Sequence, residues 1–443
     1  MGVSRAAEYL INYFEKTEHD IVVIDKDNDV IEYVTDKYSV TGICGSGASR
    51  EVLQKSGVKY ANYLVSLTPI DEINLLSSSM AKSMGAKHVI CAVESQELIK
   101  DIEYIKSNFD IDDILVPNDL ISQAIEAQVC FNVANKVSFL FNNRITLSEI
   151  TVSFKSFFSG KRLQEIKPLL KIDFLVVGVL RDNKLIIPKG DFVIKEGDTI
   201  GIMTTNDKML LLFSKLNLIH NPIKSAFIIG GGSLGEEVLN KLLKMNIKIS
   251  VIDKNIEKCK YLLEKYKNVN VICANAMDVD IYDKLDISSK SAFVCTTGVD
   301  ETNLLSSIIA RGYDVSENIT IVKTQSYEKI LKKTMFGITI STPAIIAQKV
   351  LEKLFVLKND DSHYYAFDSS MLKTYEFRIY EGFKFIGSPI KSHRYKKGVI
   401  IGAIQRNDEV IVPNGDEVLL LNDKIFVLAQ AEENILGADD LFY

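Results

Sequence analysis

The stretch SAFIIGGGSLGEEVLNKLL (225–243) decides the fold. Its apolar run AFII has the length of a buried strand, and an amphipathic segment typical of a helix follows the glycines. Gly230, Gly232 and Gly235 fit the pattern G-x-G-x-x-G. In this pattern the first glycine makes a tight turn, the second lets a pyrophosphate approach the backbone, and the third lets the helix pack on the strand. The stretch therefore predicts the first strand and helix of a Rossmann-like nucleotide-binding sheet, with phosphate at the helix N-terminus.

An acidic residue follows at the spacing that such a site requires. Asp253 ends the next apolar run, 18 residues after Gly235, where a carboxylate can accept hydrogen bonds from both ribose hydroxyls. Ligands of such sheets lie at the carboxyl ends of the strands. We therefore expect further contacts from Thr296, Thr297, Gly298, Glu301 and Lys323, which follow the later predicted strands. Asp300 is a predicted N-cap, and a solvated side chain is the alternative for Lys323.

The chain is a tandem repeat. Asp25 and Asp253 end matching apolar runs 228 residues apart. SLTPIDEINLLSSSMAKSMG (66–85) matches CTTGVDETNLLSSIIARGY (295–313) at an offset of 229. Later matches pair Pro117 with Pro343 and Pro188 with Pro413, in unchanged order. Because the offset drifts only slightly, we infer a duplication of the whole unit.

Each repeat divides into two parts. The first alternates short apolar runs with amphipathic stretches, which predicts βαβ units around a parallel sheet. The second shows period-2 strands broken by turns such as PKGD and PNGD. The predicted fold class is α/β, with two Rossmann-like doubly wound parallel-sheet lobes, each followed by a small β-rich α+β lobe. We predict domains at 1–125, 126–220, 221–357 and 358–443, helical bridges at about 118–143 and 343–357, and a linker at 358–364.

The first repeat lacks its leading strand. Counting 18 residues back from Asp25 gives Ala7, so that Gly2, Ser4 and Ala7 stand at the glycine positions; a shifted alignment is the alternative. A sheet without its central strand leaves two rows of backbone groups unpaired. We therefore expect either that the chain start is placed too late, or that another element fills the gap and the repeat is a structural partner. Under both accounts the second repeat is the better nucleotide site.

Bulk composition excludes several function classes. With 47% hydrophobic and 25% charged residues, the chain has the composition of a folded soluble protein. A net charge of −6 argues against nucleic acid or an anionic membrane surface as the main partner. No apolar run is long enough for membrane insertion, and the start resembles neither a secretory signal nor a myristoylation site. The six cysteines and five histidines show no ligand spacing, so we expect buried thiols, no metal and a cytoplasmic location.

These residues resemble a known family. Repeats of IIGGGSLG…VID…CTTGVDETNLL…IVK, each followed by R-x-x-x-x-I-x-P-x-G-D, are similar to the cytoplasmic regulator of the Trk potassium-uptake system, built of RCK or KTN domains. The resemblance implies a ring of lobes, a homo-oligomer, docked at the inner face of the membrane on a Trk-type potassium channel or transporter subunit. It implies gating by NAD⁺ or NADH, with ATP or ADP as the alternative.

The resemblance extends the candidate site. It implies contacts from Ser233 and Leu234 in the glycine loop, and the candidates are completed by Lys254, Asn275, Ala276 and the first-repeat residues Asp25, Thr68 and Glu72. Two departures stand out: the usual Gly-Asp after the third strand is Ala274-Asn275 here, and Ala92 takes the place of the basic residue in repeat one. Asp253 would repel a 2′-phosphate, which disfavours NADP.

Other functions remain open on the residues alone. An NAD-dependent oxidoreductase shares the glycine pattern, but we expect no enzyme, because the duplication leaves no substrate domain and no Tyr–Lys or His–Asp set placed to move a proton. A regulator of another cation transporter is the nearest alternative. A third is a module that binds a cyclic dinucleotide through Arg181 and Arg406 in the β-rich lobes.

Overall fold

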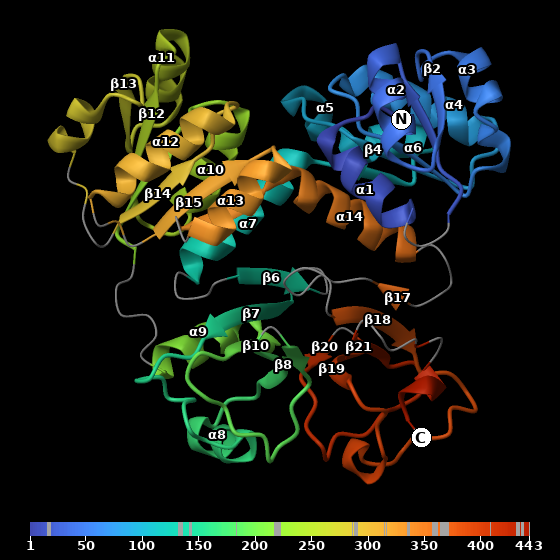
Figure 1. Ribbon diagram of the computed structural model, residues 1–443, viewed down its shortest axis with the longest axis vertical. Coiled ribbons are helices and arrows are strands. Elements are labelled where there is room, and N and C mark those ends of the chain that lie inside the picture. Colours follow the sequence, from blue (N-terminus) through green and yellow to red (C-terminus); the bar gives the residue numbers. More distant parts are fainter. Residues whose placement is uncertain are drawn as a thin grey trace. The chain divides into compact units, whose positions relative to one another are not determined.

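A computed structural model defines the fold (Figure 1). It describes residues 1–15, 19–131, 136–140, 144–182, 184–216, 223–285, 287, 291–313, 315, 317–334, 337–356, 362–363, 372–407, 409–430, 435 and 438–442. The chain forms two compact units, Met1–Glu126 with Ile223–Leu354 and Ala127–Pro222 with Phe355–Tyr443. The first unit holds the two parallel lobes and the second holds the two antiparallel lobes, so each unit pairs one repeat with the other.

The second parallel lobe has a six-stranded parallel sheet in the order β13-β12-β11-β14-β15-β16. Its elements are β11 (Ser225–Ile229), α10 (Ser233–Leu243), β12 (Lys248–Asp253), α11 (Ile256–Lys265), β13 (Val269–Cys273), η2 (Val279–Lys284), β14 (Ser291–Cys295), α12 (Asp300–Arg311), β15 (Glu317–Val322), α13 (Gln325–Thr334), β16 (Ile338–Ser341) and α14 (Thr342–Val356). The strand order reverses at β11, and right-handed crossovers then place α10 and α12 on opposite faces. This is the predicted doubly wound lobe, and the carboxyl end of β11 is its switch point.

The first parallel lobe repeats this plan with one strand fewer. Its elements are α1 (Arg5–Glu15), β1 (Val22–Asp25), α2 (Asn28–Lys37), β2 (Thr41–Cys44), α3 (Arg50–Lys55), η1 (Val58–Tyr60), β3 (Tyr63–Ser66), α4 (Asp71–Ser83), β4 (His88–Ala92), α5 (Gln96–Lys100), α6 (Ile102–Asn108), β5 (Asp113–Leu115) and α7 (Pro117–Cys130). The sheet falls into two parts, β1-β2 and β3-β4-β5. Within the described ranges, no strand fills the position in the sheet between the edge of β1 and the edge of β3.

Met1 to Val3 cover only one end of this gap. Gly2 N donates to Ile24 O at 2.8 Å, and Leu67 N donates to Met1 O at 3.0 Å. In the second lobe the same two bonds run from Gly230 N to Ile252 O and from Thr296 N to Ile229 O, both at 2.8 Å. Gly2 therefore holds the place of Gly230, which confirms the unshifted alignment of Gly2, Ser4 and Ala7 with the glycine positions.

Each of the two bridging helices, α7 and α14, packs on the parallel lobe of the other repeat (Figure 1). Residues of α14 pack against α1 in one apolar cluster that includes Ala6, Leu10, Ala347 and Val350. On the other lobe, Asp119 of α7 accepts a hydrogen bond from Lys241 of α10 at 2.7 Å. The prediction of a helix over 118–143 is wrong beyond Cys130, because Lys136–Leu140 pair with the next strand as β6.

The antiparallel lobes each hold a five-stranded sheet, β6-β7-β10-β8-β9 and β17-β18-β21-β19-β20. The first comprises β6 (Lys136–Leu140), β7 (Ile145–Thr151), α8 (Leu163–Leu170), β8 (Leu175–Arg181), β9 (Lys184–Ile186), β10 (Thr199–Thr205) and α9 (Asn206–Lys215). The second comprises β17 (Ser362–His363), β18 (Leu372–Arg378), η3 (Ile390–Ser392), β19 (Val399–Arg406), β20 (Glu409–Ile411), β21 (Lys424–Gln430) and η4 (Ala438–Leu441). A shared apolar cluster, including Val177, Met203, Ala403 and Leu428, joins the two sheets.

The fold class of the sequence analysis is confirmed, whereas the boundaries of the four predicted domains remain a prediction. The predicted linker at 358–364 lies almost wholly outside the described residues. Within the described ranges, no helix has the length and apolar character that a bilayer crossing requires.

Candidate functional site

The glycine loop of the second parallel lobe has the geometry of a phosphate cradle. Gly230 has φ +102°, and a Cβ there would lie 3.1 Å from the backbone of Thr297. A Cβ on Gly235 would lie 1.8 Å from Gly230 O, so only glycine lets α10 approach the loop this closely. A Cβ on Gly232 would meet only Lys258 Nζ, at 3.6 Å. The backbone at Gly232 is therefore open to a ligand, whereas its two companions serve packing.

The first turn of α10 has backbone N–H groups that are available as hydrogen-bond donors. Gly232 is the N-cap and supplies no side-chain cap, and the first helical bond runs from Glu236 N to Gly232 O. The N–H groups of Ser233, Leu234 and Gly235 precede that bond and have no acceptor within the helix. Since a helix N-terminus also carries a partial positive charge, this end favours an anion.

Lys258 is a candidate that the sequence analysis missed. It lies on α11, and its ammonium is the nearest group to the open side of Gly232. The sequence signal was its place five residues after Asp253, in the first turn of the helix capped by Asn255. A lysine there can neutralise a phosphate as a mobile point charge.

Asp253 lies beside the loop, as its spacing predicted, but it already holds the loop together. One carboxylate oxygen accepts the Gly231 N–H at 2.7 Å, and the other accepts the Asn255 N–H at 2.8 Å. The side chain is half-buried. Each carboxylate oxygen can accept a further bond, so the group can serve the loop and a ribose together.

The prediction of Asp300 as an N-cap is wrong. Val299 is the N-cap of α12, and the buried Asp300 carboxylate instead accepts the N–H groups of Lys323 and Thr324 at 3.0 and 2.9 Å. Asn303, which the candidates omitted, accepts from Thr297 N at 2.9 Å and donates to Thr297 O and to Ile321 O. The D-E-T-N motif is therefore a clamp that fixes the carboxyl ends of β14 and β15.

The remaining candidates of the second repeat divide by accessibility. Gly298, Glu301 and Lys323 are exposed at the carboxyl edge, as are Lys254 and Asn275 after β12 and β13. Thr297 is partly exposed. Thr296 is buried and donates to Ile229 O and Gly230 O, which ties β14 to the glycine loop. Ala276 is also buried, and its carbonyl accepts from the Tyr282 hydroxyl at 2.6 Å.

The first repeat reproduces the clamp but not the open helix end. Asp25 accepts the Val3 N–H at 2.8 Å, and Asn74 bonds Thr68 just as Asn303 bonds Thr297. Glu72 is exposed in the place of Glu301. The difference lies at Ser4, whose hydroxyl accepts the Ala7 N–H at 3.2 Å. The position of Gly232 is thus filled in this lobe by a residue that caps its own helix.

The counterpart of Lys323 in the first repeat is Glu94, and the expectation of Ala92 is wrong. Glu94 N donates to Asp71 just as Lys323 N donates to Asp300, and both pairs keep the offset of 229. Ala92 matches Ile321 instead, since both carbonyls accept from the clamp asparagine. Partial desolvation and the Asp71 carboxylate raise the pKa of the exposed Glu94, and Lys323 of the other repeat opposes that rise. The first repeat therefore presents an acid where the second presents a base.

The two parallel lobes contact each other at these edges. Arg5 Nη1, at the start of α1, lies 3.8 Å from Asp300 Oδ2. The Tyr9 hydroxyl donates to Glu328 of α13 at 2.8 Å. The helix that follows the incomplete glycine loop thus lies next to the complete site of the other repeat.

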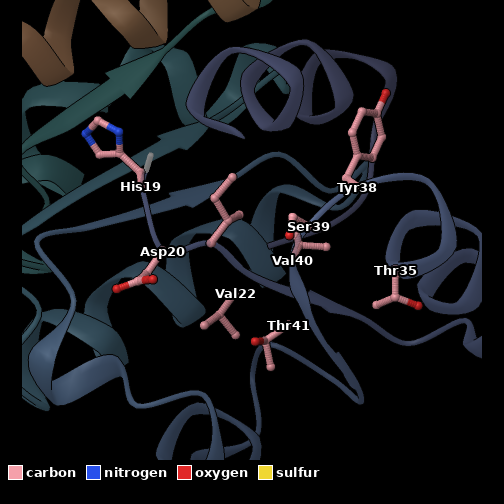
Figure 2. Close-up of a pocket in the computed structure, with 9 residues that line it drawn as sticks. His19, Asp20, Val22, Thr35, Tyr38, Ser39, Val40 and Thr41 are labelled. Carbon is pink, nitrogen blue, oxygen red and sulfur yellow. The ribbon is translucent and has the colours of Figure 1, made fainter. Parts of the chain in front are cut away.

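A separate hollow lies at the opposite end of β1 (Figure 2). It is lined by His19–Val22 at the amino end of the strand and by Thr35 and Tyr38–Thr41 around the start of β2. Asp25 and the loop of Gly2 lie at the carboxyl end of the same strand, so this hollow includes none of the candidate residues.

The arginine spacing that both β-rich lobes share has a structural role. Arg181 forms a bidentate pair with the buried Asp198, at 2.7 Å for both bonds, and Arg406 pairs with the buried Asp423 at 3.0 and 2.9 Å. Each guanidinium also donates to a carbonyl of its own lobe. These arginines fasten turns and are not free to bind a cyclic dinucleotide.

The fold and the loop define a class of protein, a tandem of Rossmann-like lobes each joined to an antiparallel lobe. Residues 1–117 and 226–342 match the TrkA-N domain, and residues 147–217 and 374–434 match the TrkA-C domain. The chain belongs to this TrkA family, which confirms the resemblance drawn from the motifs.

Relatives match over nearly the whole chain. A protein of Archaeoglobus fulgidus named Trk system potassium uptake protein TrkA homolog is 25% identical, over 94% of this chain and 93% of its own. Trk system potassium uptake protein TrkA of Haemophilus influenzae is 22% identical, over 100% and 97%.

Solved structures share the fold. The GsuK RCK domain matches with a TM-score of 0.61 and 16% identity, over 97% of this chain and 91% of that chain. The GsuK channel bound to NAD matches with a TM-score of 0.62 and 17% identity, over 97% and 76%.

Proposed function

We propose that this protein is the nucleotide-binding regulatory subunit of a potassium-uptake system, and that its ligand binds mainly in the second parallel lobe. The observation that carries the proposal is the open backbone at Gly232, beside an uncapped helix end and Lys258. Full-length relatives named for Trk potassium uptake support the transport role. The proposed partner is a membrane potassium channel or transporter subunit of the Trk type, on whose cytoplasmic side a homo-oligomer would dock.

NAD⁺ or NADH is the favoured ligand, with ATP or ADP as the alternative. The residues fit a dinucleotide: the helix end and Lys258 can hold a pyrophosphate, and Asp253 can accept from a ribose. GsuK structures bound to NAD and to ADP support both classes of ligand for the shared fold. Bound nucleotide would signal the redox or energy state of the cell. The glycine loop, Lys258 and Asp253 of this chain would bind it.

A regulatory role fits better than an enzymatic one. Three Tyr-x-x-x-Lys spacings occur in the sequence. Those of Tyr33 with Lys37 and of Tyr261 with Lys265 lie on exposed faces of α2 and α11, where each lysine also pairs with a glutamate. The third, Tyr380 with Lys384, falls in a turn of an antiparallel lobe. The Tyr380 hydroxyl donates to Asp439, and the Lys384 ammonium lies over the Phe385 ring. These contacts give the pair a structural role, so we propose no oxidoreductase activity.

Gating follows from a difference in ligand affinity between two arrangements of the lobes. A ligand that binds both arrangements equally well does not shift the equilibrium between them. Moving a two-state equilibrium from 1:99 to 99:1 needs about 5.5 kcal/mol of difference, so several sites in an oligomer would have to act together. The contact of Arg5 with Asp300 supports a route by which the first lobe would respond to changes at the second-lobe site.

The test is calorimetric titration of the full chain with NADH, NAD⁺, ATP and ADP. The informative variant is Gly232→Ala, because its methyl group has room in the protein but occupies the path of a phosphate. Gly190→Ala is the matched control, since a Cβ at that remote glycine makes only ordinary contact with Gln164. We expect at least one ligand to bind, with affinity about tenfold weaker in Gly232→Ala and unchanged in the control.

Two results would contradict the nucleotide site: no binding of any of the four ligands, or equal binding by Gly232→Ala and wild type. The transport role is tested separately, by potassium uptake in cells that lack this chain. We expect uptake from limiting potassium to fall and to return with the wild-type chain. Unchanged uptake would point to a regulator of another cation transporter.

A further inference from the structure

Two cysteines flank Asp253 in the second parallel lobe. Cys259 of α11 donates its thiol to Asp253 O at 3.3 Å, and Ala274 N donates to the same carbonyl at 3.0 Å. Cys273, the residue before Ala274, pairs with Asp253 across the parallel ladder. The Cys259 sulfur thus lies against the carbonyl that joins Asp253 to the end of β13. The Cys273 thiol is near enough to influence the pKa of Cys259.

The two thiols differ in access. Cys259 is 4% exposed, whereas Cys273 is exposed. Both cysteines are free, and the expectation of buried thiols is wrong for Cys273 and for Cys44. Burial and contact with Cys273 raise the pKa of Cys259 to about 11. Because the thiolate is the nucleophile in disulfide exchange, Cys273 is the residue that an oxidant would meet first.

The first parallel lobe provides a natural comparison. By the repeat offsets, Cys44 matches Cys273, and it is likewise exposed at the end of its strand. Ile31 stands in the place of Cys259, and the Cys44 thiol donates to Lys26 O at 3.6 Å. One lobe therefore has an exposed thiol with a thiol neighbour, and the other has the same thiol without one.

We propose that Cys259 and Cys273 are a reversible disulfide site that regulates the proposed nucleotide site around Asp253. The oxidant is a low-molecular-weight disulfide such as oxidised glutathione. The Cys273 thiolate attacks one glutathione sulfur and releases the first glutathione thiolate. Cys259 then attacks the Cys273 sulfur of the mixed disulfide, forms the Cys259–Cys273 bond and releases the second. The two thiol protons pass to the two glutathione thiolates, so two thiols and one disulfide give one disulfide and two thiols.

The expected consequence is a change at the glycine loop. The disulfide removes the S–H donor from Asp253 O and ties α11 to β13 on either side of Asp253. The carboxylate of that residue holds the Gly231 N–H, so a shift of Asp253 would alter the loop. The effect on ligand affinity rests on the proposed nucleotide site, whereas disulfide formation does not.

The experiment incubates the reduced full chain in glutathione buffers of increasing oxidised fraction. Mass spectrometry of non-reduced peptides then scores every cysteine. We expect a Cys259–Cys273 crosslink that is reversed by reduced glutathione, while Cys44 forms only a mixed disulfide with glutathione. In Cys259→Ser, Cys273 should also stop at the mixed disulfide. Calorimetry on the oxidised and reduced wild type should show nucleotide binding about fivefold weaker when oxidised, with no such difference in Cys259→Ser.

The outcomes separate the two proposals. If Cys273 of the wild type forms only a mixed disulfide with glutathione, as expected for Cys44, the proposed disulfide site is overturned. If the crosslink forms and ligand affinity stays the same, the regulatory role is overturned. If no nucleotide binds in either state, the nucleotide site fails, and with it the regulatory role, while the crosslink stands on its mass alone.

Discussion

The two parallel lobes share their clamps and differ at their phosphate edge. In both, an aspartate and an asparagine of the D-E-x-N motif fix the ends of neighbouring strands. In the second lobe the edge carries Gly232, Gly235 and Lys323, whereas the first has Ser4, Ala7 and Glu94 at these places. The duplication thus kept what holds a lobe together and changed what would hold an anion. The motif that both lobes repeat has a structural role here, and the residues that differ lie at the edge where we propose the nucleotide site.

The largest expected effect concerns a buried acid found in only one lobe. Glu317 starts β15, where His88 starts β4 of the first lobe, and burial raises its pKa to about 8. The folded state therefore binds more protons than the unfolded state between pH 4.5 and 8, and stability falls as pH rises through that window. The total loss is up to about 5 kcal/mol. Glu317→Gln should remove this slope, so that the variant is more stable than wild type at pH 8.5 and similar at pH 5.

Thermal unfolding at the two pH values measures this effect. Glu257→Gln is the matched control, because it makes the same exchange at an exposed side chain of α11. A wild-type slope that survives in Glu317→Gln would contradict the assignment to this carboxyl group.

The second largest effect on stability tests how closely α10 packs on the glycine loop. Gly235→Ala places a methyl group 1.8 Å from Gly230 O, a rigid backbone atom, and should cost about 3 kcal/mol. The reciprocal change Ala7→Gly relieves no clash and should cost about 1 kcal/mol through helix propensity. Urea unfolding of both variants measures the difference. Equal costs would show that the two loops are packed alike despite their sequences.

The clamp asparagines should behave identically. Asn74→Ala and Asn303→Ala each leave the N–H of a half-buried threonine and the carbonyl of a neighbouring strand without their partner, at about 2 kcal/mol per variant. Hydrogen exchange of the amides around Thr68 and Thr297 reports each lobe separately. Protection that drops in one lobe only would show that the motif has a ligand role there beyond its structural one.

The fold was predictable because it rests on patterns that the sequence carries locally. The glycine turn, the alternation of apolar runs and the offset between repeats were enough to predict two doubly wound lobes and the missing strand. The end of α7 was not, since the switch from helix to β6 after Cys130 depends on pairing with β7, which is a tertiary contact.

The candidate site was predictable only in part, for a physical reason. The sequence spacing predicted that Asp253 lies beside the glycine loop. It could not show which polar side chains form hydrogen bonds within the protein itself. Asp300, Thr296 and Arg181 are polar residues at functional-looking places whose partners are internal. Glu94 was missed because the strands β4 and β15 are too dissimilar in sequence to align by eye, and the match to Lys323 rests on the bonds of both N–H groups to the clamp aspartates. Lys258 was missed because its proximity to Gly232 arises between two helices.

The smallest effect on stability is the sharpest test of the comparison between the lobes. Gly232→Ser gives the second lobe the residue that the first lobe has, and the new hydroxyl can cap the Gly235 N–H as Ser4 caps that of Ala7. A serine N-cap is worth a few tenths of a kcal/mol over glycine, so the variant should be slightly more stable than wild type. The same hydroxyl occupies the donor and the space that a phosphate would use, so nucleotide binding should fall by about tenfold or more. Thermal unfolding and calorimetry on one preparation measure the two effects, with Ser4→Gly as the reciprocal variant. Gained stability with unchanged binding would mean that the open helix end is not where the ligand sits.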